Sequence, residues 1–305
     1  MIKKLFIVAC GALALASCAE KESKIVTDSG LEIDVINGGT DEIDPGMTLL
    51  VDFVVKTTDD SVLMSTVSEG LPRPARKVDS IWRGNAGGIE EVIFNLKNKD
   101  SVCFNISADK LYGHVTPPGI EKETMLKVNM AVREAMTNED FQSYRMQKIQ
   151  EMEAEQLNMD VDIIDAYLEE NGISAQKTDS GLHYIITEEG EGANVQVGDV
   201  ITANYSGYVL NGPYFDSSIE EVAKDNGIYQ EGRTYEPFQT AIGQGRVIKG
   251  WDEGFQLLNK GAKATFYIPS PLAYGARARS KEIGPNSILV FDVELIDIES
   301  GSEEK

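Results

Sequence analysis

Four short sequence motifs occur twice in this 305-residue chain, in the same order and at a nearly constant separation. The paired segments are residues 28–31 and 179–182, 45–53 and 197–205, 111–113 and 273–275, and 125–130 and 288–293. Two copies of this length indicate two similar domains, since a solenoid would stack several shorter units. The repeat therefore limits the chain to one small fold used twice.

Each copy combines short strands, separated by turn signals, with one helix. The helical face of the second copy repeats at intervals of three and four residues, and the first copy does the same. These apolar faces are Ile248, Trp251, Phe255 and Leu258 in the second copy, and Ile89, Val92, Ile93 and Leu96 in the first. Residues 288–296 form an apolar run typical of a buried strand. The pattern predicts an α+β domain in which an antiparallel sheet wraps around one helix.

A helical connector, residues 137–175, joins the copies. Thr137 and Asp140 approximate a capping box at its start. A second helical piece is expected to begin near Asp160 and to end at Asn171-Gly172, a common C-terminal cap. Its sparse apolar stripe favours packing against the chain's own domains, and a homodimer formed through it is the alternative.

The first seventeen residues have the pattern of a targeting signal. Lys3 and Lys4 precede an apolar run that is too short to span a bilayer as a mature helix. The run ends in Leu15-Ala16-Ser17-Cys18, which resembles a bacterial lipoprotein signal. We therefore expect residues 1–17 to be removed and Cys18 to be lipidated. An ordinary signal peptide with an incidental cysteine is the alternative.

Charge and histidine content argue against several classes of protein. The formal net charge of −22 leaves no basic stripe for nucleic acid. His114 and His183 have no cysteine or carboxylate set at metal spacing. Gly243-Gln244-Gly245 lacks the Gly-Lys-Ser/Thr of a phosphate loop. The sequence predicts neither a metal site nor a cofactor.

Three segments of the second copy together resemble the FKBP family of peptidyl-prolyl isomerases. They are residues 215–218 (Phe-Asp-Ser-Ser), 247–254 (Val-Ile-Lys-Gly-Trp-Asp-Glu-Gly) and 273–275 (Ala-Tyr-Gly). The resemblance is close over 176–299 and holds only in outline over 24–136. Ten residues fall where that family places its pocket: Tyr205, Phe215, Asp216, Phe238, Val247, Ile248, Trp251, Tyr274, Ile283 and Phe291.

The resemblance implies rotation about the peptide bond that precedes proline. Tyr205, Asp216 and Tyr274 would be the catalytic residues, with Asp216 orienting the site through its charge and transferring no proton. The other seven residues would bind substrate, with Trp251 as the floor beneath the proline ring. Two departures from the family pattern are a longer segment at 218–236 and Glu282-Ile283-Gly284-Pro285 near the tip of the flap.

The first copy keeps the scaffold of this pattern and loses its site. Phe53, Leu63-Met64, Ile89 and Val128 stand where the second copy has Tyr205, Phe215-Asp216, Trp251 and Phe291. We therefore expect residues 18–136 to form a degenerate FKBP-like domain without activity. Residues 176–305 would form the catalytic domain and would carry most of the activity as a separate fragment.

These features predict an isomerase anchored by lipid in a bacterial cell envelope, at the outer membrane. Its partners would be exported polypeptides that contain proline, and nucleic acid is not expected. The alternatives are a non-catalytic peptide-binding chaperone and a component of an envelope assembly.

Overall fold

The chain divides into two compact units, Met1–Met146 and Gln147–Lys305. The computed structural model describes residues 23–69, 72–77, 87–113 and 115–301. Both units are α+β and each contains one seven-stranded antiparallel sheet, as the repeat predicted.

The sheet of the second unit has the order β12-β11-β16-β15-β9-β8, and β13 also pairs with β11. Its strands are β8 (Gln176–Lys177), β9 (His183–Glu188), β11 (Val200–Val209), β12 (Tyr214–Ser217), β13 (Phe238–Ala241), β15 (Lys263–Ile268) and β16 (Leu289–Glu299). A second, two-stranded sheet pairs β10 (Glu191–Asn194) with β14 (Asn259–Lys260). The longest pairing of this sheet joins β11 to β16.

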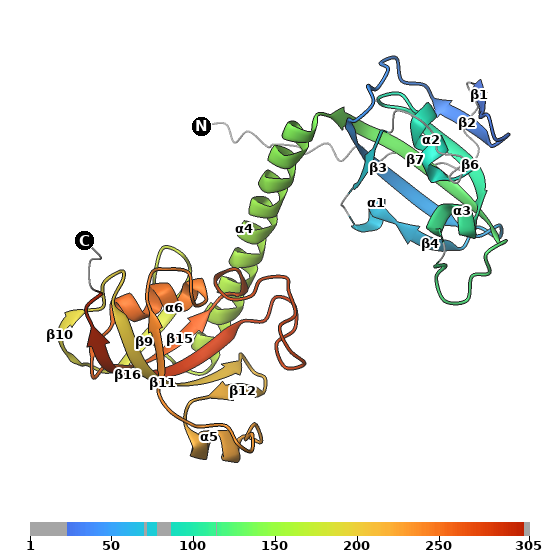
Figure 1. Ribbon diagram of the computed structural model, residues 1–305. Helices are drawn as coiled ribbons and strands as arrows, with labels where there is room; N and C mark the ends of the chain where they lie inside the picture. Colours follow the sequence, from blue (N-terminus) through green and yellow to red (C-terminus); the bar gives the residue numbers. More distant parts are fainter. Residues whose placement is uncertain (1–22, 70–71, 78–86, 114, 302–305) are drawn as a thin grey trace. The chain divides into compact units, whose positions relative to one another are not determined.

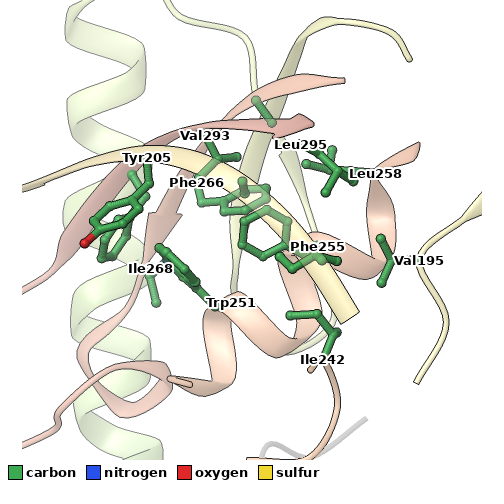
Figure 2. Close-up of a cluster of buried hydrophobic side chains, with 14 of the residues drawn as sticks. Val195, Tyr205, Ile242, Trp251, Phe255, Leu258, Phe266, Ile268, Val293 and Leu295 are labelled. Carbon is green, nitrogen blue, oxygen red and sulfur yellow. The ribbon is translucent and has the colours of Figure 1, made fainter. Parts of the chain in front are cut away.

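One short helix, α6 (Lys249–Gly254), lies against the sheet and continues as the 3₁₀ turn η2 (Phe255–Leu257) (Figure 1). The residues of its predicted apolar face, among them Trp251 and Phe255, are buried with strand residues such as Phe266 and Val293 (Figure 2). Gly254 allows this close packing, because a Cβ there would lie 2.9 Å from the ring of Phe266. The remaining short elements are α5 (Glu220–Asp225) and η3 (Ser270–Leu272).

The sheet of the first unit repeats this order as β4-β3-β7-β6-β2-β1, with β5 paired to β3. Its strands are β1 (Ser23–Val26), β2 (Glu32–Asn37), β3 (Thr48–Lys56), β4 (Val62–Ser65), β5 (Arg73–Arg76), β6 (Ser101–Ser107) and β7 (Met125–Met136). Its helices are α1 (Thr66–Glu69), α2 (Ile89–Asn95) and α3 (Ala108–Tyr112). The helix α2 carries the apolar face expected from the sequence.

Equivalent hydrogen bonds fix the correspondence between the two copies. The hydroxyl of Ser29 donates to Glu91 of α2, as the hydroxyl of Ser180 donates to Glu253 of α6. The N–H of Phe53 donates to Thr66 Oγ1 at 2.9 Å, and the N–H of Tyr205 donates to Ser218 Oγ at the same distance. The two sequences can therefore be compared position by position.

The connector is one continuous helix, α4 (Asn138–Glu170), and not the two pieces expected from the sequence (Figure 1). Thr137 caps it through a 3.1 Å bond from the N–H of Asp140. The C-terminal half of α4 belongs to the second unit, because Ile164 and Leu168 are buried against Tyr267 and other sheet residues. The compact second unit thus begins well before the expected boundary at residue 176.

Charged side chains also attach α4 to the second unit. His183 of β9 lies between two acceptors, with Nε2 2.8 Å from Asp165 Oδ1 and Nδ1 3.0 Å from the carbonyl oxygen of Gly181. Lys177 donates to the other oxygen of Asp165 at 3.0 Å. Burial opposes ionisation of Asp165, but the hydrogen bonds from Lys177 and His183 outweigh it, so the pKa of Asp165 is lowered.

The expected signal segment and lipidation site, residues 1–18, lie outside the described residues, as does His114. Within the described part of the chain, no helix is long and apolar enough to cross a membrane. In the same residues, no three His, Cys, Asp or Glu side chains come together as a metal site would require.

Candidate active site

A cavity of about 250 Å³ opens in the second unit between α6 and the edge of the sheet that carries β11, β12 and β13. Strands supply half of the lining residues, and the segment that leads into α6 supplies three more. Trp251 comes from α6 and Tyr274 from the segment after η3. The lining residues are Tyr205, Phe215, Asp216, Phe238, Arg246, Val247, Ile248, Trp251, Tyr274 and Phe291. Segments more than 80 residues apart in the chain thus meet at one hollow.

Trp251 forms the floor of the cavity, and four aromatic rings pack around it edge to face. Its ring centroid lies 5.3 Å from Tyr205, 5.1 Å from Phe291, 5.2 Å from Phe255 and 5.9 Å from Phe238, at interplanar angles of 71–78°. Figure 2 shows Trp251 beside Tyr205 and Phe255. Such arrangements match the quadrupoles of aromatic rings. Trp251 is therefore locked in one orientation, with its indole N–H buried and lacking an acceptor among the described residues.

The polar side of the cavity is a single hydrogen-bonded group centred on Asp216. The hydroxyl of Tyr205 donates to Asp216 Oδ2 at 2.6 Å, and Arg233 Nη1 donates to Oδ1 at 2.6 Å. Burial, and then the hydrogen bond to Asp216, raise the pKa of Tyr205 well above its ordinary value. The phenol therefore stays protonated and keeps donating at any physiological pH.

Arg233 is a site residue that the sequence analysis missed. It belongs to the long segment 218–236, and its bond to Asp216 raises the pKa of the guanidinium further. Its signal in the sequence was weak: it is one of two basic residues in an otherwise acidic stretch. Tyr229 and Tyr235 stack at 5.6 Å, and Arg233 lies over the ring of Tyr235. The longer segment therefore contributes a positive charge to the site.

Gly207 of β11 keeps space between the walls of the cavity. A Cβ at this position would lie 2.7 Å from both Phe215 and Phe291, closer than real Cβ contacts. The two rings themselves pack edge to face at 5.6 Å. Only glycine lets these rings approach the strand backbone, so Gly207 is a second site residue absent from the sequence-based set.

Nine of the ten residues expected at the pocket line the cavity, and Ile283 does not. Ile283 is 4% exposed and packs in the core, while its backbone shapes the flap through bonds with Arg279 and Ser280. Arg246 lines the cavity without having been expected. Among the described residues, the N–H of Ile248 has no acceptor, so it is available to a ligand carbonyl.

In the described strands of the first unit, a side chain stands where the second unit has Gly207. In the strand register, Val55 pairs with Met64 and Val128 just as Gly207 pairs with Asp216 and Phe291. Val55 is 1% exposed, so its side chain fills the volume that Gly207 leaves open. The equivalence derived from sequence for Phe53, Met64 and Val128 agrees with this register. That of Ile89 with Trp251 agrees with the matching bonds of Glu91 and Glu253, each two residues further along its helix.

Comparisons with known proteins identify a family and several relatives. The family model for FKBP-type peptidyl-prolyl cis-trans isomerase matches residues 191–296. FK506-binding protein 1 of Saccharomyces cerevisiae is 46% identical over 110 residues, which are 36% of this chain and 85% of that protein. The probable FKBP-type peptidyl-prolyl cis-trans isomerase FkpA of Neisseria meningitidis is 39% identical over 172 residues, 53% of this chain and 58% of the relative.

A probable FKBP-type isomerase of Haemophilus influenzae is 38% identical over 132 residues, 43% of this chain and 48% of that protein. The chain thus spans about half the length of these two bacterial relatives. The second unit thus combines an antiparallel sheet, one short helix packed against it and an aromatic cavity between them. The chain belongs to the FKBP-type peptidyl-prolyl cis-trans isomerase family.

Proposed function

We propose that the second unit catalyses cis–trans isomerisation of peptide bonds that precede proline. The observation that carries this proposal is an aromatic cavity with the hydrogen-bonded pair Tyr205–Asp216 in its wall, which Arg233 completes from outside the lining. Such a cavity fits a proline ring, and it has no nucleophile–base pair with which to break a bond.

The chemistry follows from the electronic structure of the amide. Resonance gives the C–N bond a rotational barrier of about 18–20 kcal/mol. In the twisted transition state resonance is lost, so the amide becomes less polar than in the planar ground state. A cavity walled by Trp251, Phe215 and Phe291 favours the less polar state, which is differential binding of the transition state. Because no proton moves, Tyr205 and Asp216 orient and polarise the peptide.

The experiment is a protease-coupled assay of the full chain on a proline tetrapeptide. We expect faster isomerisation with the native protein, and a kcat/KM lower by about a hundredfold in Trp251→Ala, since the floor is lost and the cavity becomes wet. The chain supplies its own matched control, because Ile89 occupies the position of Trp251 in the first unit. Ile89→Ala should leave kcat/KM within about twofold. Equal losses in both variants would refute the assignment of activity to the second unit.

A peptide-binding chaperone without catalysis is the second candidate. Met152, Met159 and Ile163 of α4 are about half exposed, and flexible methionines suit binding of varied apolar segments. The two functions separate in an assay of aggregation with an unfolded client that lacks proline. Suppression of aggregation that survives Trp251→Ala would assign the holding activity to another surface. A homodimer formed through α4 is a further proposal, which sedimentation equilibrium of the full chain tests.

We further propose that Cys18 is lipidated, that the protein is held at the outer membrane of a bacterial envelope, and that its substrates are exported polypeptides containing proline. The signal pattern of residues 1–18 supports this proposal. Labelled palmitate should enter the native protein and Cys103→Ala but not Cys18→Ala. Recovery of unlabelled native protein in the soluble periplasmic fraction would contradict the anchor.

A further inference from the structure

One carboxylate of α4 is buried in an otherwise apolar contact. Asp160 is 1% exposed and lies on the same helix face as Ile164 and Leu168, which pack in the core of the second unit. Burying a carboxylate costs several kcal/mol unless hydrogen bonds replace its hydration. An aliphatic residue would pack at this position without that cost. Asp160 must therefore make contacts that an aliphatic side chain cannot make.

Both oxygens of Asp160 accept hydrogen bonds from neutral amides. The backbone N–H of Ser270 donates to Oδ2 at 2.6 Å, and the side chain of Gln156 donates to Oδ1 at 2.7 Å. Ser270 is itself fully buried and is the first residue of η3. Asp160 of α4 is thus hydrogen-bonded to the backbone at the start of the segment that leads to Tyr274.

Ser270 is in turn hydrogen-bonded to the backbone of the residues on either side of Tyr274. Its carbonyl oxygen accepts from the N–H of Ala273 at 2.9 Å and from that of Gly275 at 2.8 Å. The carbonyl oxygen of Gly275 in turn accepts from the N–H of Asn286 at 2.8 Å. Tyr274 is therefore bracketed by two residues whose backbone is bonded to Ser270.

Packing does not support this segment on the side that faces α4. A second cavity of about 220 Å³ lies there, between Ile149, Met152, Glu153 and Gln156 of the helix and Pro271, Gly275, Ala276 and Asn286. Tyr274 itself is 37% exposed. Leu272 and Ala273 pack against the core of the unit, which holds the segment on that side. Toward α4 the segment borders the hollow, and the bond from Ser270 to Asp160 links it to the helix there.

We propose that Asp160 is a positioning residue for the isomerase site: it holds Ser270, and through Ser270 it fixes Tyr274 at the rim of the cavity. The α4 helix is then part of the catalytic apparatus. This inference rests on the proposed function and on the catalytic role that the family resemblance implies for Tyr274, which we take to be donation of its hydroxyl to a substrate carbonyl.

The test compares variants of the full chain. Asp160→Leu removes both acceptors and keeps an apolar side chain of similar size. Asp160→Asn keeps one carbonyl oxygen for the N–H of Ser270. Asp165→Asn is the matched control, since Asp165 lies on the same helix but contacts His183 and Lys177 and not the Tyr274 segment. The readouts are kcat/KM on a proline tetrapeptide and amide hydrogen exchange at Ser270 and Gly275.

We expect Asp160→Leu to lower kcat/KM about tenfold, the usual effect of losing a hydrogen bond to a charged group. Asp160→Asn should lower it by about two- to threefold, and Asp165→Asn by less than about twofold. Exchange at Ser270 and Gly275 should accelerate in Asp160→Leu only. In a Tyr274→Phe background, Asp160→Leu should cost less than about twofold, because the hydroxyl that it positions is already absent.

Several outcomes would overturn the inference. One is an exchange rate at Ser270 and Gly275 that is the same in Asp160→Leu as in the native protein. Another is a tenfold loss of kcat/KM from Asp160→Leu both with and without the Tyr274 hydroxyl, because that result indicates general destabilisation. If Asp160→Leu does not fold, a native kcat/KM in Asp160→Asn would also refute it. If the native chain shows no isomerase activity, the proposed function fails, and the exchange rates alone decide whether Asp160 holds the segment.

Discussion

Removing α4 from the second unit should unfold it or leave it marginally stable. Two fragments test this: one begins at Gln147 and the other at Gln176, and both end at Lys305. The shorter fragment lacks Ile164 and Leu168, which are 0% and 6% exposed in the structure. The expectation from sequence, that residues 176–305 carry most of the activity alone, is revised for this reason.

The magnitude follows from the buried side chains. Each of the two aliphatic residues contributes about 1.5–3 kcal/mol by its burial. Their loss therefore removes about 3–6 kcal/mol, before the bond from Ser270 to Asp160 is counted. A domain of this size is typically stable by only about 5–15 kcal/mol. Tyr267 and Val290, which pack against the helix, would also become exposed.

The assay is urea unfolding at 25 °C followed by tryptophan fluorescence, since Trp251 is in the core of this unit. We expect a cooperative transition for the longer fragment, and an early or absent transition for the shorter one. In the longer fragment, Ile164→Ala should cost about 2–4 kcal/mol, while Met159→Ala, half exposed on the same helix, should cost less than about 0.5 kcal/mol. Equal stability of the two fragments would refute the argument that α4 completes this core.

Three further changes test the site and its electrostatics. Gly207→Ala should lower kcat/KM about tenfold or more, since its Cβ would displace the cavity walls; native activity would show that the walls yield freely. Tyr205→Phe and Asp216→Asn should each lower kcat/KM by an amount that corresponds to about 1–2 kcal/mol of transition-state stabilisation. The kcat/KM of the native protein should stay constant between about pH 6 and 8, and a bell-shaped profile in that range would indicate proton transfer. Asp165 has a lowered pKa, so the stability that its carboxylate gives to the fold is present above about pH 4 and is lost as the pH falls further. The native protein should therefore have a higher urea midpoint than Asp165→Asn above about pH 4, and this difference should shrink below it. A difference that does not change with pH would contradict the prediction.

The repeat and the apolar periodicities were sufficient to predict the fold class, because both depend on local spacing. Nine of the ten pocket residues were likewise accessible, since large aromatic residues in a fixed order leave a clear pattern. The break expected in the connector near Asp160 was wrong: α4 runs through that point without interruption. A polar residue inside an apolar stripe looks like the start of a new helix unless its buried partner, here Ser270, is known.

Other site residues could not be found from sequence for a similar reason. Arg233 meets Asp216 from 17 residues away, across a segment of unusual length, so no spacing rule connects them. The importance of Gly207 depends on two rings that approach it from β12 and β16, and a strand glycine alone carries no such information. In each case the missing knowledge was which distant groups the fold brings together.

The buried side chain of Val55 bears on how the two copies could have diverged. Restoring a cavity in the first unit would require removing this side chain and also replacing Phe53, Met64 and Ile89. Each single step alone either leaves a void in a packed core or buries a polar group without its partner, and both cost about 1–3 kcal/mol or more. Any series of single substitutions that opens this cavity therefore passes through variants that are less stable and no more active. A working site in the first unit therefore requires several changes made together, because no single one of them both opens the cavity and supplies its polar group.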